Sequence, residues 1–173
     1  QKNQSKKYDD QGKWASTGSI IPNLIKEFMK EPFFQKKLPK STGRDLFNSD
    51  WLENFNHKNE NPEDVQRTLL ELTAISISLA IDEYCNKVDE IFICGGGSKN
   101  LFLKDRLEKL TKLKIHDTEE LGISSQTVEA VAFCWLANEC INSSPNNFPE
   151  GGITVSPPRK VVGLYCSAAY LVT

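Results

Sequence analysis

Apolar side chains recur at helical spacing in five stretches of the chain, which predicts five helices. The third is the longest and has the clearest start. A capping Asn61, a proline at the first position and two acids in the first turn all favour a helix N-terminus there. Pro32 marks the end of the first helix. The predicted helices lie at 19–31, 48–55, 61–85, 101–110 and 128–140.

Three short runs predict β-strands. Residues 91–94 form an apolar run suited to a strand buried on both faces, and 114–116 and 160–165 are further candidates. Strands and helices alternate along the second half of the chain, which is the pattern of an α/β fold. Residues 142–152 are rich in Pro, Asn and Gly and predict a loop.

The composition narrows the class of protein. A length of 173 residues allows one domain or two very small ones. The formal net charge is −2, from 21 basic and 23 acidic side chains, so nucleic-acid binding is excluded as the main function. No run approaches the roughly 18 uninterrupted apolar residues that a membrane span needs. The polar first ten residues do not resemble a signal peptide.

The five cysteines predict free thiols rather than disulfides or a zinc site. Their number is odd, no two are closely spaced, and they lie mostly in apolar stretches. Buried free thiols are typical of a reducing compartment, so a cytoplasmic location is expected. They are Cys85, Cys94, Cys134, Cys140 and Cys166.

Three consecutive glycines, Gly95, Gly96 and Gly97, end the predicted strand and precede the helix at 101–110. Glycines allow the backbone to approach a ligand closely, and the following helix start offers unpaired N–H groups to an anion. This favours a nucleotide or another anionic group at the carboxyl end of the strand. The segment is neither GxGxxG nor a P-loop. A tight turn with close helix–strand packing remains an alternative explanation.

Glu129 is the only acid within the apolar stretch 128–136. A carboxylate on a largely buried helix is rarely left unpaired. It could accept hydrogen bonds from a hydroxylated ligand, or it could be an ordinary first-turn acid. The segment 40–44 (KSTGR) could grip phosphate or be solvated surface, and neither His57 nor His116 has partners that indicate a catalytic or metal pair.

Four segments, taken in order, resemble one known family. Residues 8–18 are similar to its YDxxGxxAxxG stretch, and 40–48 (KSTGRDLFN) to its KSTGRExF segment. Residues 93–100 (ICGGGSKN) are similar to its CGGGxxN segment, and 122–137 resemble its GxxxDxMEAxAFAWLA helix. On these residues the chain resembles the 1,6-anhydro-N-acetylmuramic acid kinases over nearly its whole length.

The resemblance implies an α/β fold: an RNase H-like lobe of the actin-like ATPase fold, with a mixed sheet flanked by helices. It implies that 19–173 form the C-terminal lobe, and the polar residues 1–18 are then expected to be an inter-lobe arm or a cut end between the lobes. The N-terminal lobe, with the catalytic aspartate of a GFDTGPGN segment, would lie before Gln1. The expected partners are that lobe, a sugar substrate and, in the complete enzyme, a second copy.

The family reaction, by resemblance, opens the 1,6-anhydro ring with water and phosphorylates O6 of the sugar, in peptidoglycan recycling. It implies ATP and Mg²⁺. Gly95, Gly96, Gly97 and Asn100 match the family's adenosine-binding turn, and Glu129 matches a glutamate that reaches toward the sugar. The resemblance implies no catalytic base and no metal ligand within this chain.

Two positions depart from the family pattern. Gln126 stands where the family usually has Asp, and 153–156 (ITVS) replace VTGA. Two other functions therefore stay open: a kinase of a related sugar, and a non-catalytic nucleotide-binding or interaction module that keeps the same lobe. A small Rossmann-type oxidoreductase domain is disfavoured because the chain has no GxGxxG fingerprint.

Overall fold

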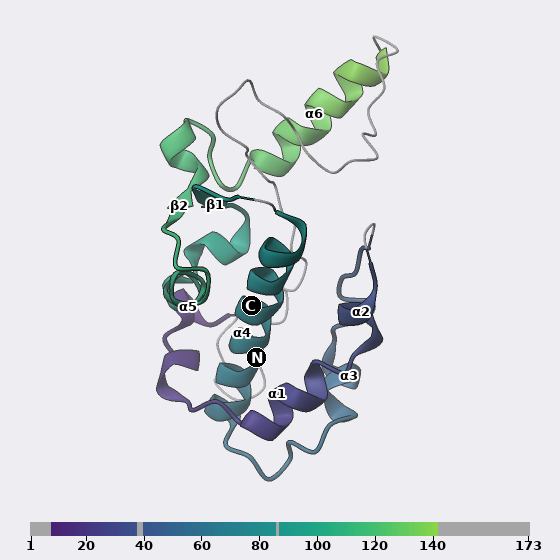
Figure 1. Ribbon diagram of the computed structural model, residues 1–173, viewed down its shortest axis with the longest axis vertical. Coiled ribbons are helices and arrows are strands. Elements are labelled where there is room, and N and C mark those ends of the chain that lie inside the picture. Colours follow the sequence, from purple (N-terminus) through teal and green to yellow (C-terminus); the bar gives the residue numbers. More distant parts are fainter. Residues whose placement is uncertain (1–7, 38–39, 86, 142–173) are drawn as a thin grey trace.

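The computed structural model describes residues 8–37, 40–85 and 87–141 (Figure 1). Within these ranges the protein combines helices with a small parallel sheet, which confirms the α/β class. No helix in these ranges is long and apolar enough to cross a membrane. The main elements are α1 (Pro22–Phe28), α2 (Pro32–Gln35), α3 (Ser49–Glu53), α4 (Pro62–Tyr84), β1 (Ile91–Ile93), α5 (Leu101–Thr111), β2 (Ile115–Asp117) and α6 (Val128–Ile141). Short 3₁₀ turns are η1 (Asp10–Gly12), η2 (Ala15–Thr17), η3 (Gly96–Lys99) and η4 (Thr118–Leu121).

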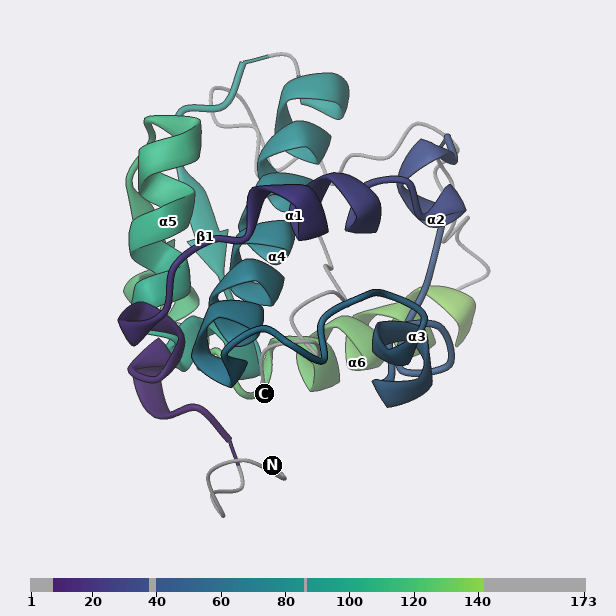
Figure 2. The same cartoon turned by 90° about the horizontal axis from the view of Figure 1, so that it is seen from below.

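Helix α4 is the central element, and apolar clusters form on two of its sides (Figures 1 and 2). Burial of these clusters is the main stabilising contribution available to the fold. The cluster toward α5 and the sheet contains Ala15, Leu70, Ala74, Leu103, Leu107 and Ile115. The cluster toward α1 and α3 contains Leu24, Phe28, Phe47, Trp51, Val65, Leu69 and Leu72.

The sheet pairs β1 with β2 in parallel, and α5 makes the crossover between them. Ile91 pairs with Ile115, and Ile93 with Asp117. Parallel strands need such a crossover, and their carboxyl ends then lie at one edge. The mixed sheet expected of an RNase H-like lobe is represented in the described ranges by this one parallel pair. The strand predicted at 160–165 lies outside the described residues.

The prediction that the first strand is buried on both faces is wrong for the described part of the chain. All three residues of β1 are only partly buried. Ile91 and Ile93 pack toward the α4–α5 cluster, whereas the ring of Phe92 lies 5.3 Å from that of His116. Successive side chains of a strand point to opposite faces, and only one face of this pair lies on the described core.

Helix α6 also differs from expectation, because a largely buried helix was predicted. The side chain of Phe133 is 64% exposed and that of Ile141 is 83% exposed, and Val131 and Trp135 are exposed as well. The helix is apolar on all sides, a composition typical of buried helices. Its apolar surface therefore exceeds what the described chain covers.

Residues 8–18 do not form a loose arm. Ala15 is fully buried in the α4–α5 cluster, and the Asp9 carboxylate accepts hydrogen bonds from the N–H groups of Trp14 (2.8 Å) and Ala15 (2.9 Å). The small side chain of Ala15 allows this close approach, although the surrounding sequence is polar. The division of the chain at residue 18 remains a prediction.

The residues that begin α3, α4 and α2 can be compared with the sequence signals at these positions. Asn48, at the start of the predicted helix 48–55, caps α3, because its Oδ1 accepts a hydrogen bond from the N–H of Trp51 (2.9 Å). Asn61 makes no such cap; its amide donates to Asp64 Oδ2 (3.1 Å). Helix α1 ends at Phe28, earlier than the predicted end at residue 31, and Pro32 begins the short helix α2, since proline suits the first helical position.

Candidate functional site

The glycine turn follows β1 at the carboxyl edge of the sheet. Gly95 adopts φ 74° and ψ −165°, a conformation that side-chain-bearing residues rarely take. A Cβ added to Gly95 or to Gly96 would meet no atom within 4 Å. The glycines at these two positions are therefore not required by close helix–strand packing, and the space beside them is open to a ligand.

The Gly95 carbonyl is held in one orientation. It accepts hydrogen bonds from the N–H (3.2 Å) and the hydroxyl (2.8 Å) of Ser98 and from the Gln126 amide (3.2 Å). In a trans peptide the following N–H points away from the carbonyl. The Gly96 N–H is thus turned away from these donors, at the first position of η3. A backbone N–H at such a turn can donate to an anion.

Asn100 has a structural contact that the sequence analysis missed. Its Oδ1 accepts a hydrogen bond from the Leu103 N–H (3.0 Å), so it is the N-cap of α5. The side chain is buried, and a Cβ on Gly12 would collide with it. The signal was available, since Asn directly before an apolar helical stretch is a preferred N-cap. A contact with adenosine remains a prediction for this residue.

The segment before α6 joins the glycine turn from the other side. The N–H of Gly95 donates to the Ser125 carbonyl (2.8 Å), and the N–H of Ser125 donates to Glu119 Oε1 (2.9 Å). Hydrogen bonds from Ser125, first from its backbone N–H and then from its side chain, lower the pKa of Glu119. Ser125 is thus hydrogen-bonded both to Gly95, which follows β1, and to Glu119, which follows β2.

A buried hydroxyl lies at the same edge of the sheet. Thr118 Oγ1, one residue after β2, is buried and has no hydrogen-bond partner among the described residues. Leaving such a group unpaired costs about 1–3 kcal/mol. Its position fits a site that further chain or a bound group completes.

Glu129 lies in the first turn of α6 and is exposed, not buried as predicted. Its charge reaches the end of β1. The pKa of the Cys94 thiol is raised, first by burial and then by the negative charge of Glu129. The Ser125 carbonyl, which accepts the Gly95 N–H, precedes Glu129 by four residues, so Glu129 lies near the carboxyl end of β1. The structure brings together Gly95, Gly96 and Glu129, which the sequence separates by more than 30 residues.

The segment 40–44 lies away from the glycine turn and the sheet. Figures 1 and 2 place the connection between α2 and α3 away from the sheet. Lys40 Nζ donates to the Phe34 carbonyl (3.4 Å) and lies 5.2 Å from the centre of the Phe33 ring. It lines a groove of about 430 Å³ together with Leu79 and Glu83 of α4. This segment is not part of the glycine-turn site.

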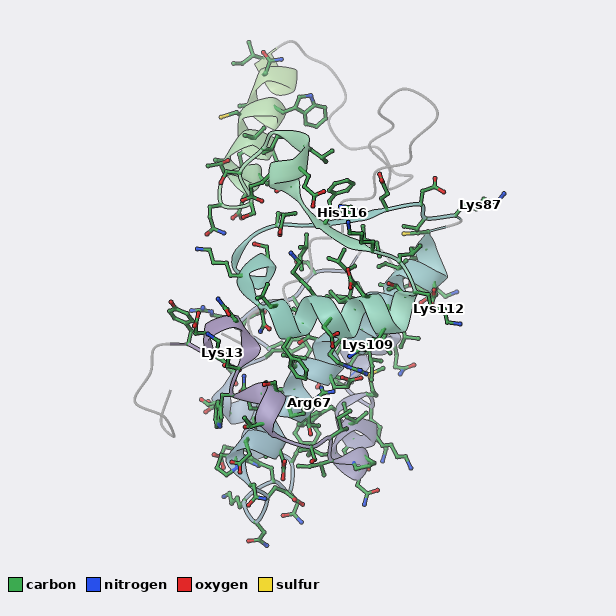
Figure 3. The ribbon with its side chains drawn as sticks, turned by 90° about the vertical axis from the view of Figure 1, so that its left-hand side faces the viewer. Lys13, Arg67, Lys87, Lys109, Lys112 and His116 are labelled. Atoms are coloured by element: carbon green, nitrogen blue, oxygen red, sulfur yellow. The ribbon has the colours of Figure 1, made fainter. Side chains whose placement is uncertain are left out.

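The two histidines have local partners. His57 Nδ1 lies 2.9 Å from the Phe55 carbonyl oxygen, and His116 Nδ1 lies 2.7 Å from Glu120 Oε2 (Figure 3). Cys85 and Cys94 are free thiols, and burial raises the pKa of both. In the described ranges no group of three His, Cys, Asp or Glu side chains could hold a metal ion.

Comparisons with known proteins agree on one family. The family model described as Anhydro-N-acetylmuramic acid kinase matches residues 1–163. The anhydro-N-acetylmuramic acid kinase of Coxiella burnetii is 42% identical over 150 residues, which are 86% of this chain and 40% of that protein. The protein of the same name from Pseudomonas syringae is 42% identical over 159 residues, 90% of this chain and 43% of that protein. The chain spans about two fifths of the length of the curated relatives it matches.

Proposed function

The chain belongs to the anhydro-N-acetylmuramic acid kinase family, and we propose that it is the nucleotide- and sugar-contacting C-terminal lobe of such a kinase. The observation that carries this proposal is that the open glycine turn is hydrogen-bonded to Ser125 and Gln126, which directly precede the helix that carries Glu129 in its first turn. The turn offers backbone donors to a nucleotide, and the carboxylate offers acceptors to sugar hydroxyls. A kinase needs these two kinds of contact side by side.

In the proposed reaction, water adds to the anomeric carbon of 1,6-anhydro-N-acetylmuramic acid and the bond to O6 breaks. O6 takes the γ-phosphoryl group, which gives N-acetylmuramic acid 6-phosphate and ADP. ATP would supply the phosphoryl group, and Mg²⁺ bound to it would offset the charge on the phosphates.

This chain's residues bind and orient the reactants. Gly95 and Gly96 leave room beside the backbone, and the Gly96 N–H can donate to an anionic oxygen. The Glu129 carboxylate can accept hydrogen bonds from sugar hydroxyls, and such charge-assisted bonds are strong. Burial and, to a lesser extent, the negative charge of Glu129 raise the pKa of the Cys94 thiol, which disfavours its thiolate form.

The catalytic base, in this proposal, belongs to an N-terminal lobe of the complete protein, and the two lobes enclose the reactants. The exposed apolar side chains of α6, Val131, Phe133 and Trp135, support a partner of this kind. Exposed apolar area of this extent on one helix is typical of a surface that another unit covers. The length of the curated relatives is consistent with such a unit.

The test is the variant Glu129→Gln in the full-length protein. It keeps the size of the side chain but loses the charge, so kcat/KM for anhydro-N-acetylmuramic acid should fall roughly ten- to a hundredfold. The melting temperature should change little. A plain first-turn acid would instead contribute only about 0.3–1 kcal/mol to stability.

The matched control is Glu63→Gln, the same change in the first turn of α4. It should leave the sugar kinetics unchanged. A lower melting temperature of Glu129→Gln with wild-type sugar kinetics would show that Glu129 is only a helix-terminus acid. Binding of ADP without phosphorylation of any anhydro or related sugar would favour a non-catalytic nucleotide-binding module.

A further inference from the structure

We infer that Gln126 is a positioning residue that fixes the glycine turn to the N-terminal end of α6, and that it thereby couples nucleotide binding to sugar binding. The contact stands on the structure alone, whereas the two ligands rest on the proposed function. Gln126 is exposed and touches no reacting atom; it acts through Gly95.

The first step is the pair of hydrogen bonds at Gly95. The Gly95 N–H donates to the Ser125 carbonyl (2.8 Å), and the Gly95 carbonyl accepts from Gln126 Nε2 (3.2 Å). The Gly95 carbonyl also accepts from Ser98 within the turn itself, but the bonds to Ser125 and Gln126 are the ones that join the turn to the segment before α6. These two hydrogen bonds stabilise the positive-φ conformation of Gly95, and both come from a segment 30 residues later in the sequence.

The second step is the rigid connection from Gln126 to Glu129. The N–H of Thr127 donates to the Ser124 carbonyl (2.9 Å), and that of Val131 donates to the Thr127 carbonyl (2.9 Å). The turn at 124–127 thus runs directly into α6, and Glu129 follows Gln126 by three residues, less than one helical turn. A displacement of the glycine turn must then move or strain the segment that carries Glu129.

The third step is the chemistry of the side chain. The Gln126 amide is a donor, and the same amide also lies 3.5 Å from the Ser125 hydroxyl. A carboxylate at this position has no hydrogen to donate and would face a carbonyl oxygen. A side chain of the same length therefore makes this contact only if it carries an N–H donor. Gln126→Glu removes the donor with almost no change in size.

The experiment compares Gln126→Glu and Gln126→Ala with a matched control, Thr127→Ala, in the full-length protein. The Thr127 hydroxyl donates only within the same turn, to the Ser124 carbonyl (3.0 Å). Hydrogen exchange of the peptide covering 95–100 is measured without ligands. We expect exchange to be about three- to tenfold faster in both Gln126 variants, corresponding to one lost hydrogen bond, and unchanged in Thr127→Ala.

The second measurement is the affinity for ADP with and without anhydro-N-acetylmuramic acid, by titration calorimetry. In the wild-type protein each ligand should change the affinity for the other by about fivefold or more. In both Gln126 variants this factor should fall toward one, whereas Thr127→Ala should keep it.

Three results would separate the positioning role of Gln126, the coupling of the two ligands and the proposed function from one another. Unchanged exchange at 95–100 in the Gln126 variants overturns the positioning role. Faster exchange with wild-type coupling between the two ligands overturns the coupling. If the wild-type protein binds neither ADP nor the sugar, the proposed function fails, and the exchange measurement still decides whether Gln126 holds the turn.

Discussion

Individual glycines in this protein differ in what they permit. Gly95 has φ 74°, so any side chain there strains the backbone, although nothing occupies the space. Gly12 has φ 73° and is also enclosed, because a Cβ would collide with the Asn100 side chain and approach Phe102 Cβ to 2.8 Å. Gly96 has neither restriction. A substitution at Gly96 therefore tests the ligand and not the fold.

Gly96→Val in the full-length protein should weaken ADP and ATP binding by roughly tenfold or more, because the new side chain fills the space into which the ligand's phosphates or ribose must come. The melting temperature and the affinity for the sugar should stay close to wild type. Calorimetry with each ligand and a thermal scan measure this. Unchanged nucleotide affinity would mean that the turn is only structural.

Gly12→Ala is the contrasting control. It should lower stability strongly, since the backbone conformation and the enclosed space both oppose a side chain.

Among the elements, α4 and α5 are joined by a buried charge cluster. The Glu71 carboxylate accepts hydrogen bonds from Arg67 Nη1 (2.7 Å) and from Arg106 Nε (2.9 Å) and Nη2 (2.8 Å). The Arg67 guanidinium also lies 4.8 Å from the centre of the Phe102 ring. Burial alone raises the pKa of Glu71, but the hydrogen bonds from Arg106 and Arg67 outweigh it and hold the pKa below 4.5.

Glu71→Gln should therefore lower the free energy of unfolding by about 3 kcal/mol or more, because two largely buried guanidinium groups lose their counter-charge. Urea and thermal unfolding of the full-length protein measure this. The surface variant Asp105→Asn, which breaks the exposed pair with Lys109, should change it by no more than about 0.5 kcal/mol. Equal effects of the two variants would contradict a stabilising role for the cluster.

The same cluster gives a pH dependence. The folded pKa of Glu71 is lower than the unfolded one, so its contribution is present above the unfolded pKa near 4.5 and is lost as the pH falls through the folded pKa. The stability difference between wild type and Glu71→Gln should accordingly be constant near neutral pH and shrink below about pH 4.5.

For the whole molecule, the exposed apolar side chains of α6 and the half-buried β1 indicate a core that the described residues do not close by themselves. Apolar surface left in water lowers the stability of an isolated unit. In the proposed function the described residues also lack the catalytic base, which belongs to the other lobe.

The isolated 173-residue chain should show no detectable phosphorylation of anhydro-N-acetylmuramic acid with Mg²⁺ and ATP, whereas the full-length protein should be active. A coupled assay for ADP release, run on both proteins at equal concentration, measures this. The full-length Glu129→Gln variant sets the level expected when only a sugar contact is lost. Turnover by the isolated chain would show that its own residues supply the base.

The sequence by itself determined the local elements. Asn48 before Trp51, Pro62 with two following acids, and the apolar run at 91–93 place α3, α4 and β1 because helix starts and strand runs depend on neighbouring residues. The family-like segments also pointed to Gly95, Gly96 and Glu129. Their proximity is consistent with that prediction, although their roles remain to be tested.

Only the tertiary structure decided the contacts between distant residues. The bonds from Ser125 and Gln126 to Gly95, the Glu71–Arg106 pair and the burial of Ala15 depend on the parallel pairing of β1 with β2 and on the packing of α5 against α4. Hydrophobic periodicity gives the face of an element but not the element that will cover it. For this reason the sequence predicted α6 as largely buried, whereas several of its apolar side chains are exposed, and the polar composition of residues 8–18 gave no sign that Ala15 is buried in the core.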